Sequence, residues 1–203
     1  MKRLFIAGTC GIFLLATPAA VAAQSKTDFT RCTTANFMGG VSFDDSNPTG
    51  VFGGAFGWEL TARLNIETTA RWLVPTDGAD AFAFLFTVQT PLLARRTFVP
   101  FLSGGAGVYS ANFDSGSTAI PEFYSRRMTP PGVPSGSAER FTDPAVVLGG
   151  GVSIFASRNV SIRPEVETIW LRSDGMNHFV TSAMVRFAYH FEEHRITAAA
   201  RPR

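Results

Sequence analysis

The chain has 203 residues, of which 18 are Lys or Arg and 16 are Asp or Glu, so its charge gives no argument for nucleic-acid binding. It contains two cysteines, which excludes a scaffold held together by several disulfides. The 19 Gly and 19 Phe, without any long helical period, favour β structure.

The first residues predict export from the cytoplasm. Lys2 and Arg3 precede the apolar run Leu4–Ala16, and small residues follow up to an Ala-x-Ala-like site at Ala20-Val21-Ala22 or Val21-Ala22-Ala23. This order is typical of a secretory signal peptide, and the apolar run is too short to cross a bilayer. We therefore predict a signal peptide over residues 1–23 and a polar periplasmic lead-in over residues 24–34.

Four strands are predicted in the first half of the mature chain, each with an apolar and a polar face. This alternation has a period of two, which is the period of a strand and not of a helix. In the third strand, Leu64, Ile66 and Trp72 share one face, while Glu67 and Arg71 share the other. The four strands cover residues 37–43, 51–60, 64–74 and 80–92.

A fifth predicted strand, residues 97–113, is glycine-rich, so the sequence leaves its two faces ambiguous. Residues 114–142 contain Gly, Ser and several prolines without periodicity, which predicts a long loop. Three alternating strands then follow, over residues 144–155, 159–171 and 178–191.

The connections are predicted to alternate in length, being longer after the first, third, fifth and seventh strands. Long outer loops that alternate with short periplasmic turns are typical of a transmembrane barrel. We therefore predict an all-β protein, an eight-stranded antiparallel up-and-down transmembrane β-barrel over residues 35–191. Residues 192–203 would form a short polar periplasmic tail. A soluble exported β-barrel is the alternative architecture.

Three segments carry a resemblance to a known family: PFLSGGAGVYSANF, SIRPEVETIWLRS and the last strand MVRFAYHF. With the signal peptide, they make the chain resemble the OmpA/OmpX-type outer-membrane β-barrel domain family of small eight-stranded, porin-like barrels. The resemblance implies a location in the cell outer membrane, contact with outer-membrane lipid and insertion by the barrel-assembly machinery.

Charged residues on the polar faces would point into the lumen of such a barrel. An eight-stranded barrel has room for its side chains but no open pore, so buried charges there should pair with one another. A gated proton or ion path along them is the alternative interpretation. The predicted network consists of Glu59, Glu67, Arg71, Arg163, Glu165, Glu167 and Arg186.

No catalytic, cofactor or metal site is predicted. The histidines His178, His190 and His194 have no Ser partner in a recognisable motif, and His178 with Ser182 is the nearest candidate pair. We therefore predict a non-enzymatic protein that contributes to envelope structure or cell-surface interaction. The alternatives are a narrow channel or transporter for small or apolar solutes and a lipid-modifying barrel enzyme.

The long loop over residues 114–142 would lie outside the cell, where loops on a rigid scaffold often carry function. Its Phe123, Tyr124, Arg126 and Arg127 are residue types favoured at binding hot spots, so we predict them as possible contacts with a surface ligand. The alternative is a proline-rich loop without a partner.

Overall fold

The computed structural model describes residues 32–192, apart from residues 45–46, 62, 94–96, 119, 129–131, 133–137 and 158. The predicted signal peptide, most of the lead-in and the predicted tail beyond Glu192 lie outside the described residues. The elements are β1 (Cys32–Asp44), β2 (Asn47–Thr61), β3 (Leu64–Thr76), β4 (Ala79–Pro91), β5 (Phe98–Phe113), α1 (Glu122–Ser125), β6 (Glu139–Phe155), β7 (Val160–Ser173) and β8 (Met176–Glu192).

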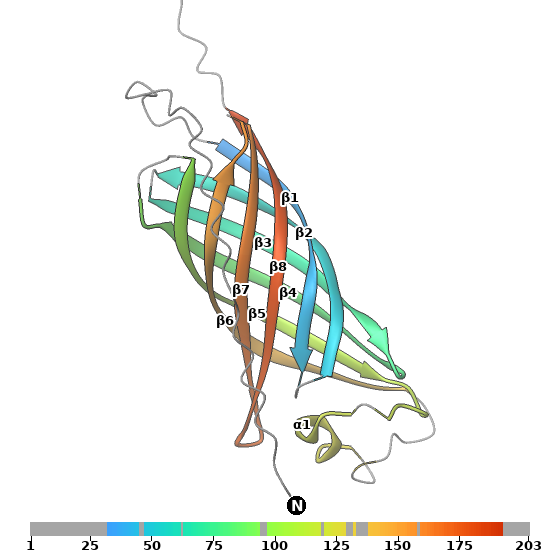
Figure 1. Ribbon diagram of the computed structural model, residues 1–203. Helices are drawn as coiled ribbons and strands as arrows, with labels where there is room; N and C mark the ends of the chain where they lie inside the picture. The colour runs from blue at the N-terminus through green and yellow to red at the C-terminus, as the bar shows by residue number, and fades with distance from the viewer. Residues whose placement is uncertain are drawn as a thin grey trace, which may run out of the picture.

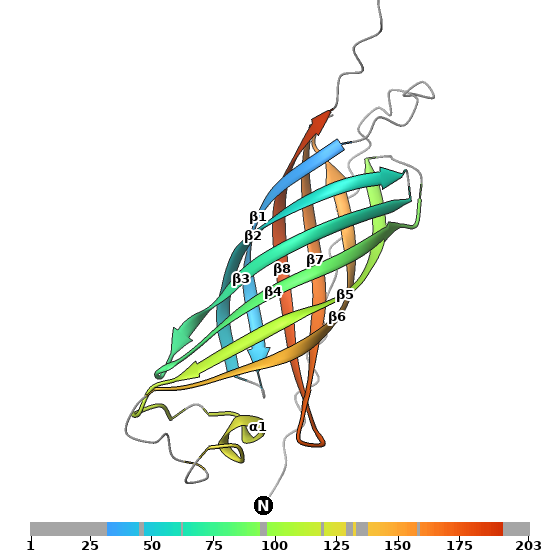
Figure 2. The ribbon, with the colours of Figure 1, turned by 180° about the vertical axis from the view of Figure 1, so that it is seen from behind.

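The eight strands close into one barrel, in which every strand pairs antiparallel with its neighbours in the sequence and β1 also pairs with β8 (Figures 1 and 2). The closing register runs from Cys32 opposite Glu192 to Asp44 opposite Val180. Closure leaves no free sheet edge. The predicted all-β, eight-stranded antiparallel up-and-down fold is confirmed.

The barrel has two different mouths. At the chain-end mouth, β1 begins, β8 ends, and β2–β3, β4–β5 and β6–β7 are connected. At the long-loop mouth, residues 114–138 connect β5 to β6 and include the short helix α1, which lies beyond the strand ends in both ribbon views (Figures 1 and 2). β1 begins at Cys32, inside the segment predicted as lead-in.

The predicted alternation of long and short connections is wrong. β3 and β4 are joined by Asp77-Gly78 alone, and β7 and β8 by Asp174-Gly175 alone. The four residues have φ values of 48°, 77°, 52° and 78°, so each pair forms the tight hairpin turn that positive φ at both positions permits. Because the turns are so tight, residues predicted as loop continue the strand pairing. Residues 114–138 are therefore the one long connection at this mouth.

Side chains alternate along each strand between an outward face of exposed, mostly apolar residues and an inward face of buried residues, which include the charged ones. In β4, Phe82, Phe84 and Phe86 are exposed, while Ala83 and Leu85 between them are fully buried. β5 follows the same rule along its whole length, with Leu102 and Val108 outside and Phe101 and Tyr109 inside, which resolves the faces that the sequence left open. Each strand contributes to the exposed apolar band, for example with Phe37, Phe52, Trp72, Phe84, Leu102, Leu148, Val166 and Phe187.

Apolar and charged side chains occupy different parts of the barrel interior. A hydrophobic cluster fills the lumen towards the long-loop mouth and includes Tyr109, Phe113, Leu171 and Val180. Buried charged side chains occupy another part of the lumen. In the described part of the chain, no helix is long and apolar enough to cross a membrane.

Candidate functional site

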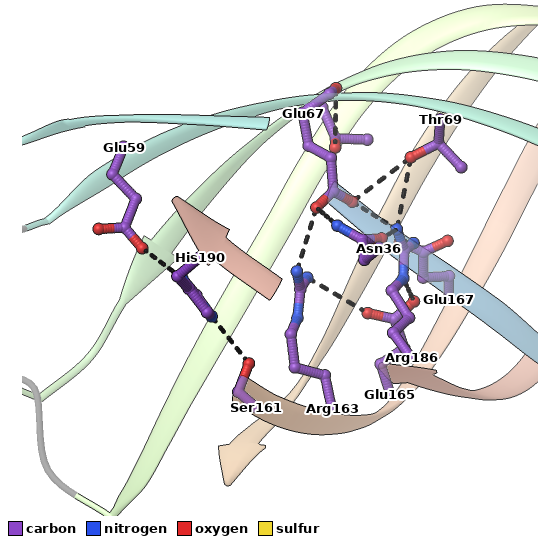
Figure 3. Close-up of polar contacts among 11 residues, drawn as sticks. Asn36, Glu59, Glu67, Thr69, Ser161, Arg163, Glu165, Glu167, Arg186 and His190 are labelled. Atoms are coloured by element: carbon purple, nitrogen blue, oxygen red, sulfur yellow. Dashed lines mark hydrogen bonds and ion pairs between the residues drawn. The ribbon is translucent and has the colours of Figure 1, made fainter. Parts of the chain in front are cut away.

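The predicted lumen charges come together inside the barrel. They lie on strands whose alternation places every second side chain in the lumen, so residues distant in sequence meet there (Figure 3). Glu59 is partly exposed near the chain-end mouth. The six buried members are Glu67, Arg71, Arg163, Glu165, Glu167 and Arg186.

Arg186 is the centre of this charge network. Its side chain on β8 is 1% exposed, and it forms ion pairs with Glu67 of β3 and Glu165 of β7. A third carboxylate, Glu167, lies 3.4 Å from its Nη2 atom. One guanidinium thus links three strands across the lumen, which fixes their positions relative to one another.

The other two arginines complete the charge balance. Arg163 Nη1 lies 3.1 Å from Glu67 Oε2, and Arg71 Nη1 lies 3.1 Å from Glu167 Oε2. Three buried arginines therefore face three buried glutamates. Removing charges from water is costly unless they pair, and this arrangement pairs every one of them.

Neutral side chains that the sequence analysis did not name support the network. Asn36 of β1 donates through Nδ2 to Glu67 Oε2 at 3.1 Å, and the Thr69 hydroxyl donates to Glu67 Oε1 at 3.4 Å. Asn36 immediately precedes the outward-facing Phe37, so its inward position could have been read from the alternation. Among the described residues, no group of His, Cys, Asp and Glu is arranged to hold a metal ion.

A second group of residues closes the long-loop mouth. We call residues 120–128 the closing segment. Its Phe123 and Tyr124 are 4% and 0% exposed, and the Tyr124 ring packs at 5.1 Å from Phe113 and 5.4 Å from Phe141. Phe123 and Tyr124 therefore do not face solvent, because burying the two rings in the mouth removes a large apolar area from water, and their contact with a surface ligand stays a prediction.

Arg127 fastens the closing segment to the barrel. Its Nη1 lies 2.8 Å from Asp143 Oδ2 of β6, and its Nε lies 3.7 Å from Asp174 Oδ2 in the β7–β8 turn. Its guanidinium carbon also lies 4.8 Å from the centre of the Phe141 ring. Of the four predicted contact residues, Arg126 alone is largely open to solvent, with 61% of its side chain exposed beside Glu122.

His178 takes part in this closure and not in a pair with Ser182. Its ring stacks on Phe123 at 5.1 Å, and its Nε2 lies 2.8 Å from Asp44 Oδ1. Ser182 instead donates to Ser42 at 3.0 Å. Burial raises the pKa of the Tyr124 phenol, so this side chain stays neutral in the closed mouth.

A third polar group lies near the chain-end mouth. Ser161 Oγ lies 2.9 Å from His190 Nε2, and His190 Nδ1 lies 3.2 Å from Glu59 Oε1 (Figure 3). This Ser–His–Glu series was not predicted from the sequence, because 29 positions separate Ser161 from His190 and 131 separate His190 from Glu59. The available signal was that all three positions face inward near strand ends at the same mouth.

These features together define a class of protein. A closed antiparallel barrel of eight strands, with an apolar exterior and an interior filled by paired charges, has the architecture of the small outer-membrane β-barrels.

Comparison with known proteins agrees with this class. No family model matches the chain, and no characterised protein of similar sequence was found. Neisserial surface protein A matches with a TM-score of 0.55 at 10% identity, over 80% of this chain and 97% of that one. Ail, the attachment invasion locus protein of Yersinia pestis, matches with a TM-score of 0.51 at 12% identity, over 81% of this chain and 100% of that one.

The N-terminal β-barrel domain of Pseudomonas aeruginosa OprF matches with a TM-score of 0.50 at 11% identity, over 77% of this chain and 97% of that one. These neighbours are small eight-stranded outer-membrane barrels, so the resemblance to OmpA/OmpX-type barrels is confirmed for the fold.

Proposed function

We propose that this chain is an outer-membrane β-barrel with a closed lumen, which acts as an envelope and surface-contact protein and not as a pore. The observation that carries the proposal is the double closure of the barrel. The paired charges around Arg186 occupy the lumen, and the closing segment occupies the long-loop mouth.

The exterior supports the membrane location. Large apolar side chains such as Phe84, Leu102 and Leu148 are 46%, 58% and 67% exposed, and similar side chains project from every strand. An apolar surface that encircles a whole molecule is unfavourable in water and is matched by lipid. Lipid is therefore the proposed partner of the barrel wall, and the barrel-assembly machinery is the proposed route of insertion.

The closure argues against solute passage. For a solute to pass, Arg186 would have to leave three carboxylates within the lumen, and Phe123 and Tyr124 would have to leave the long-loop mouth. The first step would leave buried charges without their partners. The second would expose aromatic rings that are now packed in the mouth. A closed barrel is the state that these contacts favour.

The long-loop mouth is the proposed contact surface. In the proposed orientation the start of β1 and the end of β8 lie on the periplasmic side, so the opposite mouth, with the β5–β6 connection and the β7–β8 turn, faces the outside. Glu122, Arg126 and Asp174 are exposed there and offer charged groups of both signs to a ligand. One structural neighbour is named for attachment and invasion, which supports a contact role for this chain as well.

Conductance across a planar bilayer tests the closed lumen. We expect the purified mature protein to give no steps above background, and the variant Glu67→Gln to give rare steps because it unbalances the network. Frequent, stable openings of the unmodified protein would overturn the proposal and favour the narrow-channel alternative.

Fractionation tests the location. We expect the mature protein in the outer-membrane fraction, with a gel mobility that changes on heating as the barrel unfolds. Recovery in the soluble periplasmic fraction would overturn the membrane assignment. For the contact role, cells that carry Glu122, Arg126 and Asp174 all changed to Ser should adhere less than cells with equal amounts of the unmodified protein.

A further inference from the structure

We propose that Ser161, His190 and Glu59 form a site for acyl transfer from carboxylic esters near the chain-end mouth. In this proposal Ser161 is the nucleophile, His190 the general base, and Glu59 the group that orients the imidazole. These three residues lie at the opposite mouth of the barrel from the closing segment.

The two ring nitrogens of His190 are used in the way that such chemistry requires. Glu59 Oε1 lies 3.2 Å from Nδ1, and a carboxylate only accepts hydrogen bonds, so the Nδ1 atom carries a proton. In the tautomer with its single proton on Nδ1, the Nε2 atom can accept, and Ser161 Oγ lies 2.9 Å from it. The hydroxyl proton of Ser161 therefore points at a base that is ready to take it.

The backbone around His190 is held firmly. The amide nitrogen of His190 donates to the Asn159 carbonyl at 2.8 Å, and Asn159 Nδ2 donates to the His190 carbonyl at 2.8 Å. These reciprocal bonds join β8 to the start of β7, which carries Ser161. A nucleophile and base on paired strands keep their distance without ordering a loop first.

In this proposal Arg163 is the hydrogen-bond donor to the oxyanion. It lies two positions after Ser161 on β7 and therefore on the same inward face (Figure 3). Its side chain is 6% exposed, yet its Nε makes no hydrogen bond within the described part of the chain. A buried donor without an acceptor is costly, and in the proposed reaction the carbonyl oxygen of the ester, which becomes negative, is the acceptor for this atom.

The reaction follows from these roles. Ser161 Oγ attacks the ester carbonyl carbon and its proton passes to His190 Nε2, while Arg163 faces the oxygen that becomes negative. The bond from carbon to the alcohol oxygen then breaks, and the alcohol leaves with the proton from Nε2. Water attacks the acyl-serine with the same proton transfers, which releases a carboxylic acid and restores Ser161.

The surroundings define the substrate class. The Phe155 ring lies 5.2 Å from the His190 ring, which offers an apolar contact to an acyl chain. Arg163 donates to Glu67, and Asn36 also donates to Glu67, so charged and polar side chains occupy the lumen beside the site and disfavour a long apolar acyl chain. We therefore assign the site to esters with short acyl chains that arrive through the chain-end mouth.

A serine-reactive fluorophosphonate probe tests the site on the folded mature protein in detergent, together with hydrolysis of p-nitrophenyl acetate and butyrate. We expect one label per chain, located at Ser161 by mass spectrometry. The variants Ser161→Ala and His190→Gln should each lower the rate of hydrolysis by about 100-fold or more. Arg163→Lys, which keeps the positive charge, should lower hydrolysis more than labelling because it alters the oxyanion donor.

The matched control is Ser182→Ala, since Ser182 is also a buried lumen serine but pairs with Ser42 and not with a histidine. This variant should label and hydrolyse at the unmodified rate. Heat-modifiable gel mobility shows which variants remain folded. Labelling of Ser161 no faster than that of Ser182, or hydrolysis that persists in folded Ser161→Ala, would overturn the proposal.

Discussion

Glu67 and Arg186 are buried charges that each depend on the other, since the two lie against one another in the lumen with 3% and 1% of their side chains exposed. Arg163 adds a second cation to Glu67 at 3.1 Å. Removing one of these charges is costly, because its former partners stay buried without a group of opposite charge.

Replacing Glu67 with Gln should destabilise the barrel by about 3–5 kcal/mol, since Arg163 and Arg186 would keep their charges and lose a shared carboxylate. Urea unfolding in lipid vesicles measures this change in the free energy of unfolding. Glu122→Gln is the control, because its pair with Arg126 lies open to solvent and should contribute little. Equal stability of the two variants would contradict the pairing of Glu67 with Arg163 and Arg186.

Arg127 should control the docking of the closing segment. Replacing it with Ala removes its ion pairs with Asp143 and Asp174 and its contact with the Phe141 ring. We expect chymotrypsin to cut faster at Phe123 and Tyr124, which the closed mouth protects. Arg126→Ala is the control and should leave the cleavage rate unchanged. Slow cleavage in both variants would mean that the aromatic packing alone holds the segment.

At the scale of a strand, close approach between β4 and β5 depends on glycine. A Cβ at Gly107 would lie 2.0 Å from the Phe84 carbonyl oxygen and 2.8 Å from the Leu85 Cα atom. These are backbone atoms of a paired strand, so they cannot move aside as a flexible side chain would. The glycine-rich sequence of β5 is thus a packing requirement.

Gly107→Ala should therefore cost about 1–3 kcal/mol, the usual range for overpacking, by pushing β5 away from β4. The melting temperature in detergent measures the effect. Gly116→Ala is the matched control, because nothing lies within 4 Å of a Cβ built at that position. A loss of the same size at both positions would point to a general effect of replacing glycine.

At the scale of the whole molecule, the exposed apolar band predicts a dependence on depth in the membrane. Phe84 lies in the middle of β4, and Leu64 is the first residue of β3 beside a turn. Phe84→Arg should cost about 2–4 kcal/mol in a bilayer, and Leu64→Arg about 0–1 kcal/mol. Unfolding in vesicles measures both. A similar, small cost at the two positions would contradict a bilayer around the barrel.

Much of the barrel could be predicted from alternation alone. A period of two with an apolar face was enough to find eight strands, and the same parity placed Glu67 and Arg186 on inward faces. The connections were predicted less well, because the polar composition around Asp77-Gly78 does not reveal how far the pairing continues on each side of a tight turn.

The site was only partly predictable for a related reason. Phe123 and Tyr124 are residue types that are common at binding surfaces. Whether their aromatic rings face solvent or fill a barrel mouth depends on which side chains lie beneath them. Here Tyr124 packs on Phe113 and Phe141, which lie on the strands that flank the loop, and Phe123 stacks on His178 of β8.

The sequence by itself determined the strands, their two faces and the sign of each lumen charge, because these depend on residue type and on a local period. The tertiary structure alone decided which charges pair, that the long loop folds back into its mouth, and that Ser161 meets His190 and Glu59. Those contacts depend on barrel closure and strand register, which bring distant positions within a few ångströms, whereas a local pattern shows only which face each residue is on.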